Sequence, residues 1–155
     1  MDVLFVNPGN ASGIYQDLAK DYSAIETPTW SLLLAQSCRS VGYEVGILDV
    51  NAERLNEDQA VARIKSANPR LVCFVVYGQN PNAGTVNMSG TVMLAKAIKA
   101  SGFESPISAV GSHVNALPLE TLRKEKDIDF IFTNEGVYAL WNVLKLDNMT
   151  DTNQL

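Results

Sequence analysis

LVCFVVY, residues 71–77, is apolar at every position. Three of these residues are valine, whose branched side chain favours extended backbone. A strand with one face in water alternates apolar and polar side chains, whereas the central strand of a parallel sheet is covered on both faces and shows no alternation. The segment therefore predicts the middle strand of a parallel sheet, with helices packed against both faces.

Four further β-rich runs alternate with helical patterns along the chain, as they do in βαβ units. The predicted strands are Val3–Val6, Val45–Leu48, Leu71–Tyr77, Ile107–Val110 and Ile128–Phe132. The predicted helices run from Thr27-Pro28 to Gly42, over Glu57–Ala67, over Met88–Ala100, shortly after Pro118, and over Val137–Leu144. Crossovers between parallel strands are right-handed. The pattern thus predicts a three-layer α/β fold, a doubly wound parallel five-stranded sheet with the flavodoxin-like order 2-1-3-4-5.

Composition is that of one globular domain, with 46% hydrophobic and 19% charged residues among 155. We expect the domain to span residues 1–146, because residues 147–155 have little to bury and form a flexible tail. The net charge of −5 argues against nucleic acid, whose phosphates require clustered Lys and Arg. No apolar run is long enough to cross a bilayer, and the amino terminus lacks the basic start of a signal peptide. We therefore expect a cytoplasmic protein without membrane contact.

Few residues are suited to metal or nucleophilic chemistry. Cys38 and Cys73 are the only cysteines, and each lies in an apolar pattern that predicts a core position. His113 is the only histidine, so a Ser-His-Asp triad or a two-histidine metal site has no partners in this sequence. We expect His113 to be a hydrogen-bonding loop residue, and we predict no catalytic residue and no metal ligand.

Two connections at the carboxyl ends of the strands, where doubly wound sheets bind ligands, are longer than structure requires. About 20 residues separate the first strand from the helix at Pro28, whereas such connections usually take 2–6. The second connection, Gly78–Asn87, is rich in amide side chains and contains two glycines. It suits a large ligand that bears amides and hydroxyls. An ordinary polar loop would also account for it.

The candidate cofactor-binding residues follow the five strands and are mostly glycines and uncharged polar residues. They are Asn7, Pro8, Asn51, Tyr77, Gly78, Gln79, Asn80, Gly111, Ser112, His113, Asn134, Glu135 and Gly136. Gly111 lets a flat ligand or a phosphate lie against the backbone, although a tight turn explains it too. Glu135 opens the last helix and also complements its dipole. The segment Asp49–Asn51 follows the second strand, where dinucleotide folds place a ribose-binding acid, but the absence of Gly-x-Gly-x-x-Gly excludes nicotinamide.

In order and spacing, the sequence resembles the cobalamin-binding domain that precedes the barrel in cobalamin-dependent radical SAM enzymes. The similarity covers almost the whole chain. It is carried by Val3–Pro8, Thr27–Ala35, Gly42–Val45, Val110–His113, Leu117-Pro118 and Asp129–Gly136. The resemblance implies that cobalamin (B12) lies across the strand ends, with its nucleotide tail between the third and fourth strand loops. It assigns Tyr77–Asn80, Gly111–His113 and Asn134–Gly136 to the cofactor.

Two departures from the family pattern affect what the resemblance implies. Many cobalamin domains carry Asp-x-His-x-x-Gly after the first strand, with the histidine on cobalt, whereas this chain has Asn7-Pro8-Gly9-Asn10-Ala11. The resemblance therefore implies base-off, His-off cobalamin. The Cys-x-x-x-Cys-x-x-Cys motif of the barrel is also missing, so we expect no Fe–S cluster here. We expect no catalysis by this chain alone, and a radical SAM barrel domain or subunit as its partner.

The leading hypothesis is a cobalamin-binding module of a B12-dependent radical SAM methyltransferase or related enzyme. A flavodoxin-like module that binds FMN or another nucleotide is the alternative, because its fold would be the same. Against it, the connection after the first strand lacks a dense Ser/Thr run for a phosphate. A signalling receiver is excluded, because acidic residues and a lysine are missing from the strand ends that require them. A degenerate fragment without a ligand remains a third reading.

Overall fold

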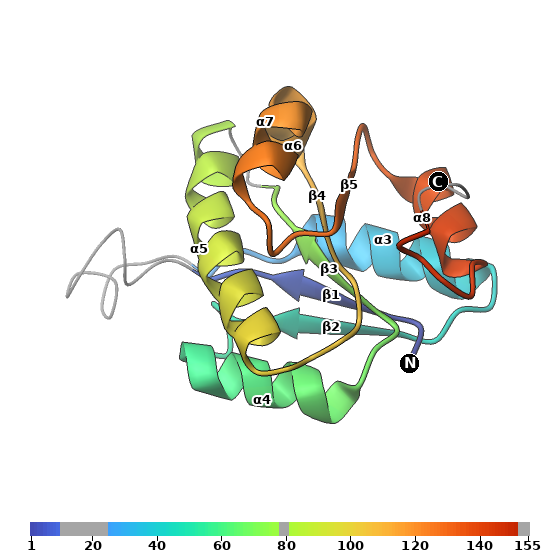
Figure 1. Cartoon of the computed structure of the whole chain (residues 1–155), viewed down its shortest axis with the longest axis horizontal. Coiled ribbons are helices and arrows are strands. Elements are labelled where there is room, and N and C mark those ends of the chain that lie inside the picture. Colours follow the sequence, from blue (N-terminus) through green and yellow to red (C-terminus); the bar gives the residue numbers. More distant parts are fainter. Residues whose placement is uncertain (10–24, 78–80, 152–155) are drawn as a thin grey trace.

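The computed structural model describes residues 1–9, 25–77 and 81–151. In these residues five parallel strands form one sheet in the order β2-β1-β3-β4-β5. The strands are β1 Val3–Asn7, β2 Val45–Asp49, β3 Leu71–Val75, β4 Ile107–Val110 and β5 Phe130–Phe132. The predicted α/β fold and its strand order are confirmed (Figure 1).

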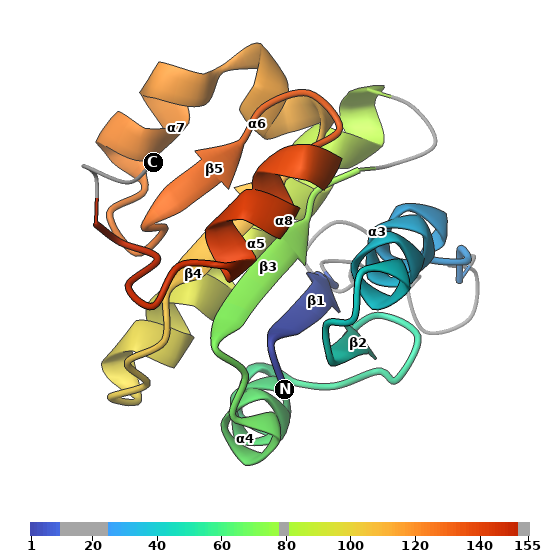
Figure 2. The same cartoon turned by 90° about the vertical axis from the view of Figure 1, so that its right-hand side faces the viewer.

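Helices cover both faces of the sheet. The helices of one face are α3 Thr29–Ser40 and α8 Val137–Leu144. The helices of the other face are α4 Glu57–Ala67, α5 Pro81–Ala100, α6 Ser112–Ala116 and α7 Pro118–Lys124 (Figure 2). None of the described helices combines the length and apolar character needed to span a membrane.

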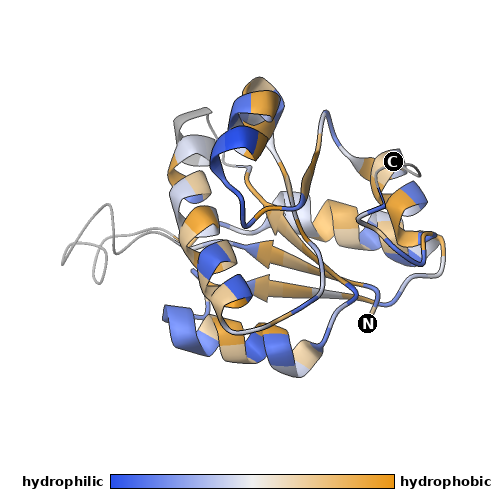
Figure 3. Ribbon diagram, in the orientation of Figure 1, coloured by the Kyte–Doolittle hydropathy of each residue, from blue (hydrophilic) through white to orange (hydrophobic). Residues whose placement is uncertain are grey.

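The core has two halves, because successive strand residues point to opposite faces. On β3, Val72 and Phe74 pack toward α4 and α5, whereas Cys73 and Val75 pack toward α3 and α8. Every residue of β3 is buried, which confirms its predicted place in the middle of the sheet. Figure 3 shows the same arrangement, with hydrophobic strands between helices of mixed hydropathy.

Helix α4 has the predicted bounds because local signals define both of its ends. Asn56 Oδ1 accepts a hydrogen bond from Gln59 N at 2.9 Å, and Gln59 Oε1 accepts one from Asn56 N at 3.0 Å. This reciprocal capping box satisfies two backbone donors at the start of the helix. At the other end Asn68 adopts a left-handed conformation and is followed by Pro69, which cannot continue the helix.

Helix α5 begins at Pro81, well before the predicted start at Met88. Residues 81–87, expected to form a polar loop, are instead its first turns. Proline is favoured in a first turn because its missing N–H would have no helical partner there. The glycine and amide side chains of this segment conceal the helical pattern, and Gly84 is buried against the Ser112 Oγ atom.

Two other helices differ from prediction. Helix α6, over Ser112–Ala116, was not predicted, so His113 lies in a short helix and not in the expected loop. Helix α3 begins at Thr29 with Pro28 at its N-cap, whereas Thr27 was the expected cap.

The packed part of the chain continues past the predicted boundary at residue 146. Met149 is only 4% exposed and belongs to the core beside α3 and α8. Residues 152–155 of the predicted tail lie outside the described residues.

Gly111, directly after β4, lies close against the backbone of Val76, directly after β3. Its backbone φ is +149°, and a Cβ atom there would collide with the carbonyl group and Cα atom of Val76. The Val76 N–H donates a 2.7 Å hydrogen bond to the Val110 carbonyl, which holds the two segments together. The chain's own packing therefore requires glycine at this position.

Both cysteines are free thiols in the half of the core beside α3. Burial raises the pKa of Cys38 to about 11 and that of Cys73 to about 12. For Cys73, a hydrogen bond with Ser108 opposes part of this increase. Because the pKa of each thiol is higher in the folded than in the unfolded state, the buried thiol contributes to the free energy of unfolding. This contribution is complete below the pKa of the unfolded state, near 9, and is lost as the pH rises through the pKa of the folded state.

We expect both thiols to react slowly while the protein is folded. A pKa raised from 9.0 to about 11 leaves roughly 100-fold less thiolate at pH 8, even before access is considered. Ellman's reagent should label neither thiol quickly at pH 8, and both quickly in urea. The free energy of unfolding should also decline from pH 9 to pH 11. Fast labelling of either thiol in the folded protein would contradict the burial described.

Substituting Gly111→Ala should destabilise the fold by about 3 kcal/mol, because the new methyl group meets rigid backbone. Gly102→Ala is the matched control, since Gly102 also has a positive φ of +74° but open space around it. The control should cost only about 1 kcal/mol of left-handed strain. Urea unfolding followed by circular dichroism measures both changes. If both variants lost the same free energy of unfolding, contact with Val76 would not be the reason for glycine at position 111.

Candidate functional site

The parallel register gathers the five strand ends at one edge of the sheet. Asn7 lies opposite Asp49, Val75 opposite Val110, and Val110 opposite Phe132. We name this edge the carboxyl rim. It consists of residues 7–9, 49–51, 76–77, 111–113 and 133–136.

Most of the predicted binding residues meet at this rim. Asn7, Pro8 and Asn51 lie where β1 and β2 end, and Tyr77 follows β3. Two further groups follow β4 and β5, namely Gly111–His113 and Asn134–Gly136. Gly78, Gln79 and Asn80 lie outside the described residues.

The segments that follow β1 and β2 contact each other. A Cβ atom on Gly9 would lie 3.1 Å from the backbone N of Asn51, so the two segments are in direct contact. The amide side chains of Asn7 and Asn51 are half-buried, and neither forms a hydrogen bond with the described part of the chain. This end of the rim therefore presents two amide groups that are not used by any of the described residues.

Tyr77 connects four elements at the centre of the rim. Its ring stacks on that of Trp30 in α3, with centroids 4.4 Å apart and planes inclined by 20°. Its hydroxyl donates to the Asn134 carbonyl at 3.2 Å, and its carbonyl accepts from Asn87 Nδ2 at 2.9 Å. Asn134 N in turn donates to Asn115 Oδ1 at 2.8 Å. Burial, and then the charge of Glu135, raise the pKa of Tyr77.

The segment after β5 turns sharply into α8. Asn134 and Gly136 both have positive φ values, of 54° and 70°. A Cβ atom on Gly136 would approach the Phe132 Cβ to 3.0 Å, so glycine relieves both strain and crowding. Glu135 lies exposed between them.

Three buried side-chain oxygens near the rim lack a hydrogen bond in the described structure. They are Ser31 Oγ, Asp49 Oδ2 and Ser112 Oγ. Leaving a buried polar group unpaired costs about 1–3 kcal/mol each, so such groups usually have a partner. Their position near one edge makes them candidates for hydrogen bonds with a group that binds there.

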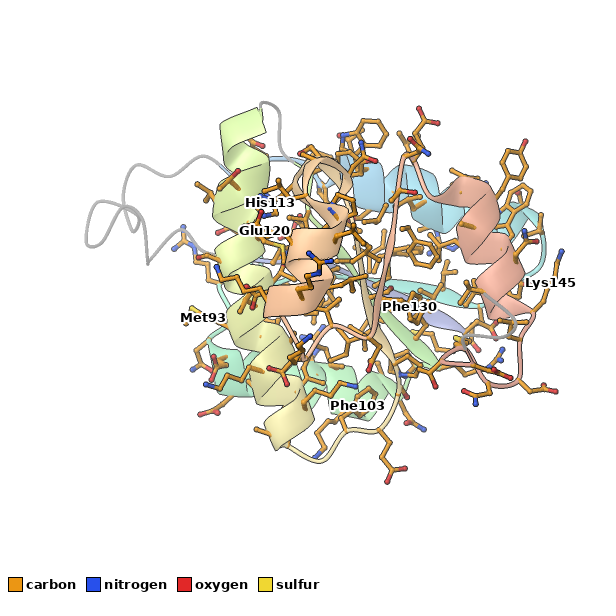
Figure 4. The ribbon with its side chains drawn as sticks, turned by 45° about the horizontal axis from the view of Figure 1, so that its top comes forward. Met93, Phe103, His113, Glu120, Phe130 and Lys145 are labelled. Carbon is orange, nitrogen blue, oxygen red and sulfur yellow. The ribbon has the colours of Figure 1, made fainter. Side chains whose placement is uncertain are left out.

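His113 lies away from the α3 face. Its Nδ1 atom is 3.4 Å from Thr85 Oγ1, and its ring lines a cavity of about 500 Å³ between α5 and the α6–α7 segment. Met93 and Glu120 line the same cavity (Figure 4). Tyr77, by contrast, packs with the core beside α3 and α8.

Sequence reasoning did not select three residues that this geometry brings to the site. Asp49 could have been found, because a carboxylate that ends an apolar strand is costly to bury without a role. Ser31 and Trp30 lie in an ordinary helical pattern and give no such signal. Their importance depends on contacts with residues that are distant in the sequence.

Comparison with known proteins gives one family. A family model described as the B12 binding domain matches residues 16–144. No curated protein matches the sequence.

Solved structures of larger enzymes share the fold. The radical S-adenosylmethionine methyltransferase TsrM from Kitasatospora setae, with its tryptophan substrate and aza-SAM bound, is 16% identical with a TM-score of 0.69. The match covers 92% of this chain and 25% of TsrM. A second TsrM structure, with cobalamin and a [4Fe-4S] cluster bound, has a TM-score of 0.68 at 16% identity, over 94% of this chain and 24% of that one.

A third structure is the cobalamin-dependent S-adenosylmethionine radical enzyme OxsB, with aqua-cobalamin and S-adenosylmethionine bound. It is 16% identical with a TM-score of 0.66, over 93% of this chain and 18% of OxsB. The chain thus spans a quarter or less of the length of these enzymes, and at such identities the likeness concerns the fold. Because the family model covers most of the sequence, this chain belongs to the B12-binding domain family, and its fold resembles part of cobalamin-dependent radical SAM enzymes.

Proposed function

We propose that this chain binds cobalamin at the carboxyl rim and holds it for a radical SAM barrel, without catalysing a reaction by itself. The observation that carries the proposal is a set of polar groups at and beside the rim that have no hydrogen-bond partner among the described residues. Asn7 and Asn51 offer free amides, and Ser31, Asp49 and Ser112 have buried oxygens without partners in the described structure.

These residues fit cobalamin because the periphery of a corrinoid carries many primary amides. An amide supplies both N–H donors and a carbonyl acceptor, so it can pair with side-chain amides, hydroxyls and carboxylates. The rim has few charged side chains, which suits a neutral periphery better than a phosphate cluster. Family membership supports the same ligand.

The centre of the rim is pre-organised for a broad ligand. Tyr77 is held by Trp30 on one side and by Asn87 and Asn134 through hydrogen bonds. Trp30 remains 40% exposed, so part of its ring is available for contact. A site that is ordered before binding loses less conformational entropy when the ligand arrives.

The remaining predicted contacts belong to the same proposal. Gly111 and Ser112, with Asn134, Glu135 and Gly136, form the rim after β4 and β5. We include Pro8, because it is buried beside Asn7, and Gly78, Gln79 and Asn80, because they directly follow Tyr77.

The proposal includes base-off, His-off cobalamin, and the position of the only histidine supports its His-off part. His113 lies in α6 beside Thr85, and its ring lines the cavity on the α5 face. The chain after β1 has Asn7-Pro8-Gly9 and offers no imidazole. Bound cobalamin would supply a cobalt centre able to carry a methyl group, while the protein supplies orientation.

A radical SAM barrel, in the same polypeptide or a separate subunit, is the proposed partner. The TsrM structure contains both cobalamin and a [4Fe-4S] cluster, and this chain corresponds to about a quarter of that protein. Methyl transfer from cobalt to a substrate would be the task of such an assembly.

Anaerobic titration with hydroxocobalamin, followed by visible absorbance, tests the proposal. We expect saturable binding by the wild-type chain. Asn7→Ala and Asn51→Ala should each weaken it about tenfold, because each removes roughly 1.4 kcal/mol of hydrogen bonding to the ligand. Gln36→Ala is the matched control, since it removes an exposed amide from α3 away from the rim.

The spectrum of the bound cofactor should be unchanged in His113→Ala, because this imidazole is not a cobalt ligand. A flat titration by a chain with native circular dichroism would refute cobalamin binding. A shift in the spectrum upon loss of His113 would refute His-off ligation alone.

A further inference from the structure

The Asp49 carboxylate uses only one of its two oxygens. Oδ1 accepts a hydrogen bond from Ala52 N at 2.9 Å and so closes the turn after β2. Oδ2 is buried and receives no hydrogen bond in the described structure. The residue as a whole is 9% exposed, which is unusual for an unpaired carboxylate.

Among the described residues, no ion-pair partner lies at this oxygen. None of these ion pairs includes Asp49, and Arg63 pairs with Glu53 at 3.0 Å. Asn7 lies directly opposite Asp49 in register, yet its amide does not donate to the carboxylate. An isolated anion in this position destabilises the protein unless a donor reaches it.

A second unpaired oxygen lies on the same side of the sheet. Val45 and Ile47 pack toward α3, and Asp49 continues this alternation at the end of β2. Helix α3 lies over β1 and β2, and Ser31 in its first turn is 1% exposed with Oγ unpaired. One unpaired group in the first turn of α3 and another on the sheet face that α3 covers favour a missing ligand group over a single misplaced side chain.

Resting on the proposed function, we propose that Asp49 selects amidated corrinoids. Oδ2 accepts a hydrogen bond from an N–H of one peripheral amide of the corrinoid. A corrinoid with a carboxylate in place of that amide has no donor to offer and adds a like charge. The site therefore rejects it, because specificity for a donor arises when its absence leaves a buried acceptor unpaired.

Access to Oδ2 requires a rearrangement. The atom has almost no exposed area, so a ligand amide reaches it only if the residues around it shift. A hydrogen bond to a buried anion is stronger than one between neutral groups, which favours that shift. Local rearrangement is common when ligands bind.

The isosteric substitution Asp49→Asn distinguishes this role from a structural one. Asparagine keeps an oxygen for the Ala52 N–H, so the turn is retained. It replaces the unpaired anionic oxygen with a neutral N–H donor, which costs less to bury. The free chain should therefore become more stable, while its preference among corrinoids should change.

The experiment compares wild type and Asp49→Asn with cobalamin and with the set of cobalamin derivatives in which one peripheral amide is hydrolysed to a carboxylate. We expect wild type to bind one derivative at least about 30-fold more weakly than cobalamin. Asp49→Asn should bind cobalamin about tenfold more weakly and lose or reverse this discrimination. Its midpoint of urea unfolding without ligand should rise. Asp147→Asn, an exposed substitution beyond α8, should match wild type in every respect.

Each outcome decides between the two claims. Equal binding of all derivatives by wild type would overturn the role of Asp49 and leave cobalamin binding intact. A more stable Asp49→Asn chain with unchanged discrimination would mean that the carboxylate is only strained, and would also overturn the role. A less stable Asp49→Asn chain would show that Oδ2 has a partner within the protein, which would also overturn the role. Absence of binding by folded wild type would reject both proposals.

Discussion

Burial of β3 on both faces is the constraint on which the rest of the structure depends. Its side chains are covered by α4 and α5 on one face and by α3 and α8 on the other. Polar groups cannot gather on either face of such a strand without losing hydration. The edge where the strands end is the place left for them, and parallel pairing brings all five ends to that edge.

The rim combines rigid and unsatisfied parts. Gly111 packs against the Val76 backbone, and Tyr77 joins α3 to the segments after β4 and β5 through Trp30, Asn134 and Asn115. Around this framework, Asp49 Oδ2 and the Ser31 and Ser112 hydroxyls have no hydrogen-bond partner in the described structure. A fold optimised for stability alone would have paired or replaced these groups, because each unpaired group reduces the free energy of unfolding. Their retention is consistent with a surface completed by a ligand.

Elements with strong local sequence signals were predicted correctly, whereas features that depend on tertiary contacts were missed. The strands were located because their apolar runs end at turn formers, and α4 was located because its capping box and Asn68-Pro69 are local. The first turns of α5 were missed because Gly84 and its polar neighbours mimic a loop, and α6 was missed because it is only five residues long. The stacking of Trp30 on Tyr77 depends on tertiary contact, which no local pattern reports. Asp49 was not selected, although a carboxylate at the end of an apolar strand is a local signal. Gly111 was expected to make room for a ligand, and its contact with Val76 supplies a reason within the chain itself.

The central claim is that a corrinoid binds at the carboxyl rim and not at the opposite edge of the sheet. Hydrogen–deuterium exchange with and without hydroxocobalamin tests it most directly, because backbone amides report protection along the whole chain. The account predicts protection that is concentrated in residues 7–9, 49–52, 76–77, 111–115 and 133–137. Protection confined to the opposite edge, for example at residues 42–44, 68–70 and 102–106, would contradict it.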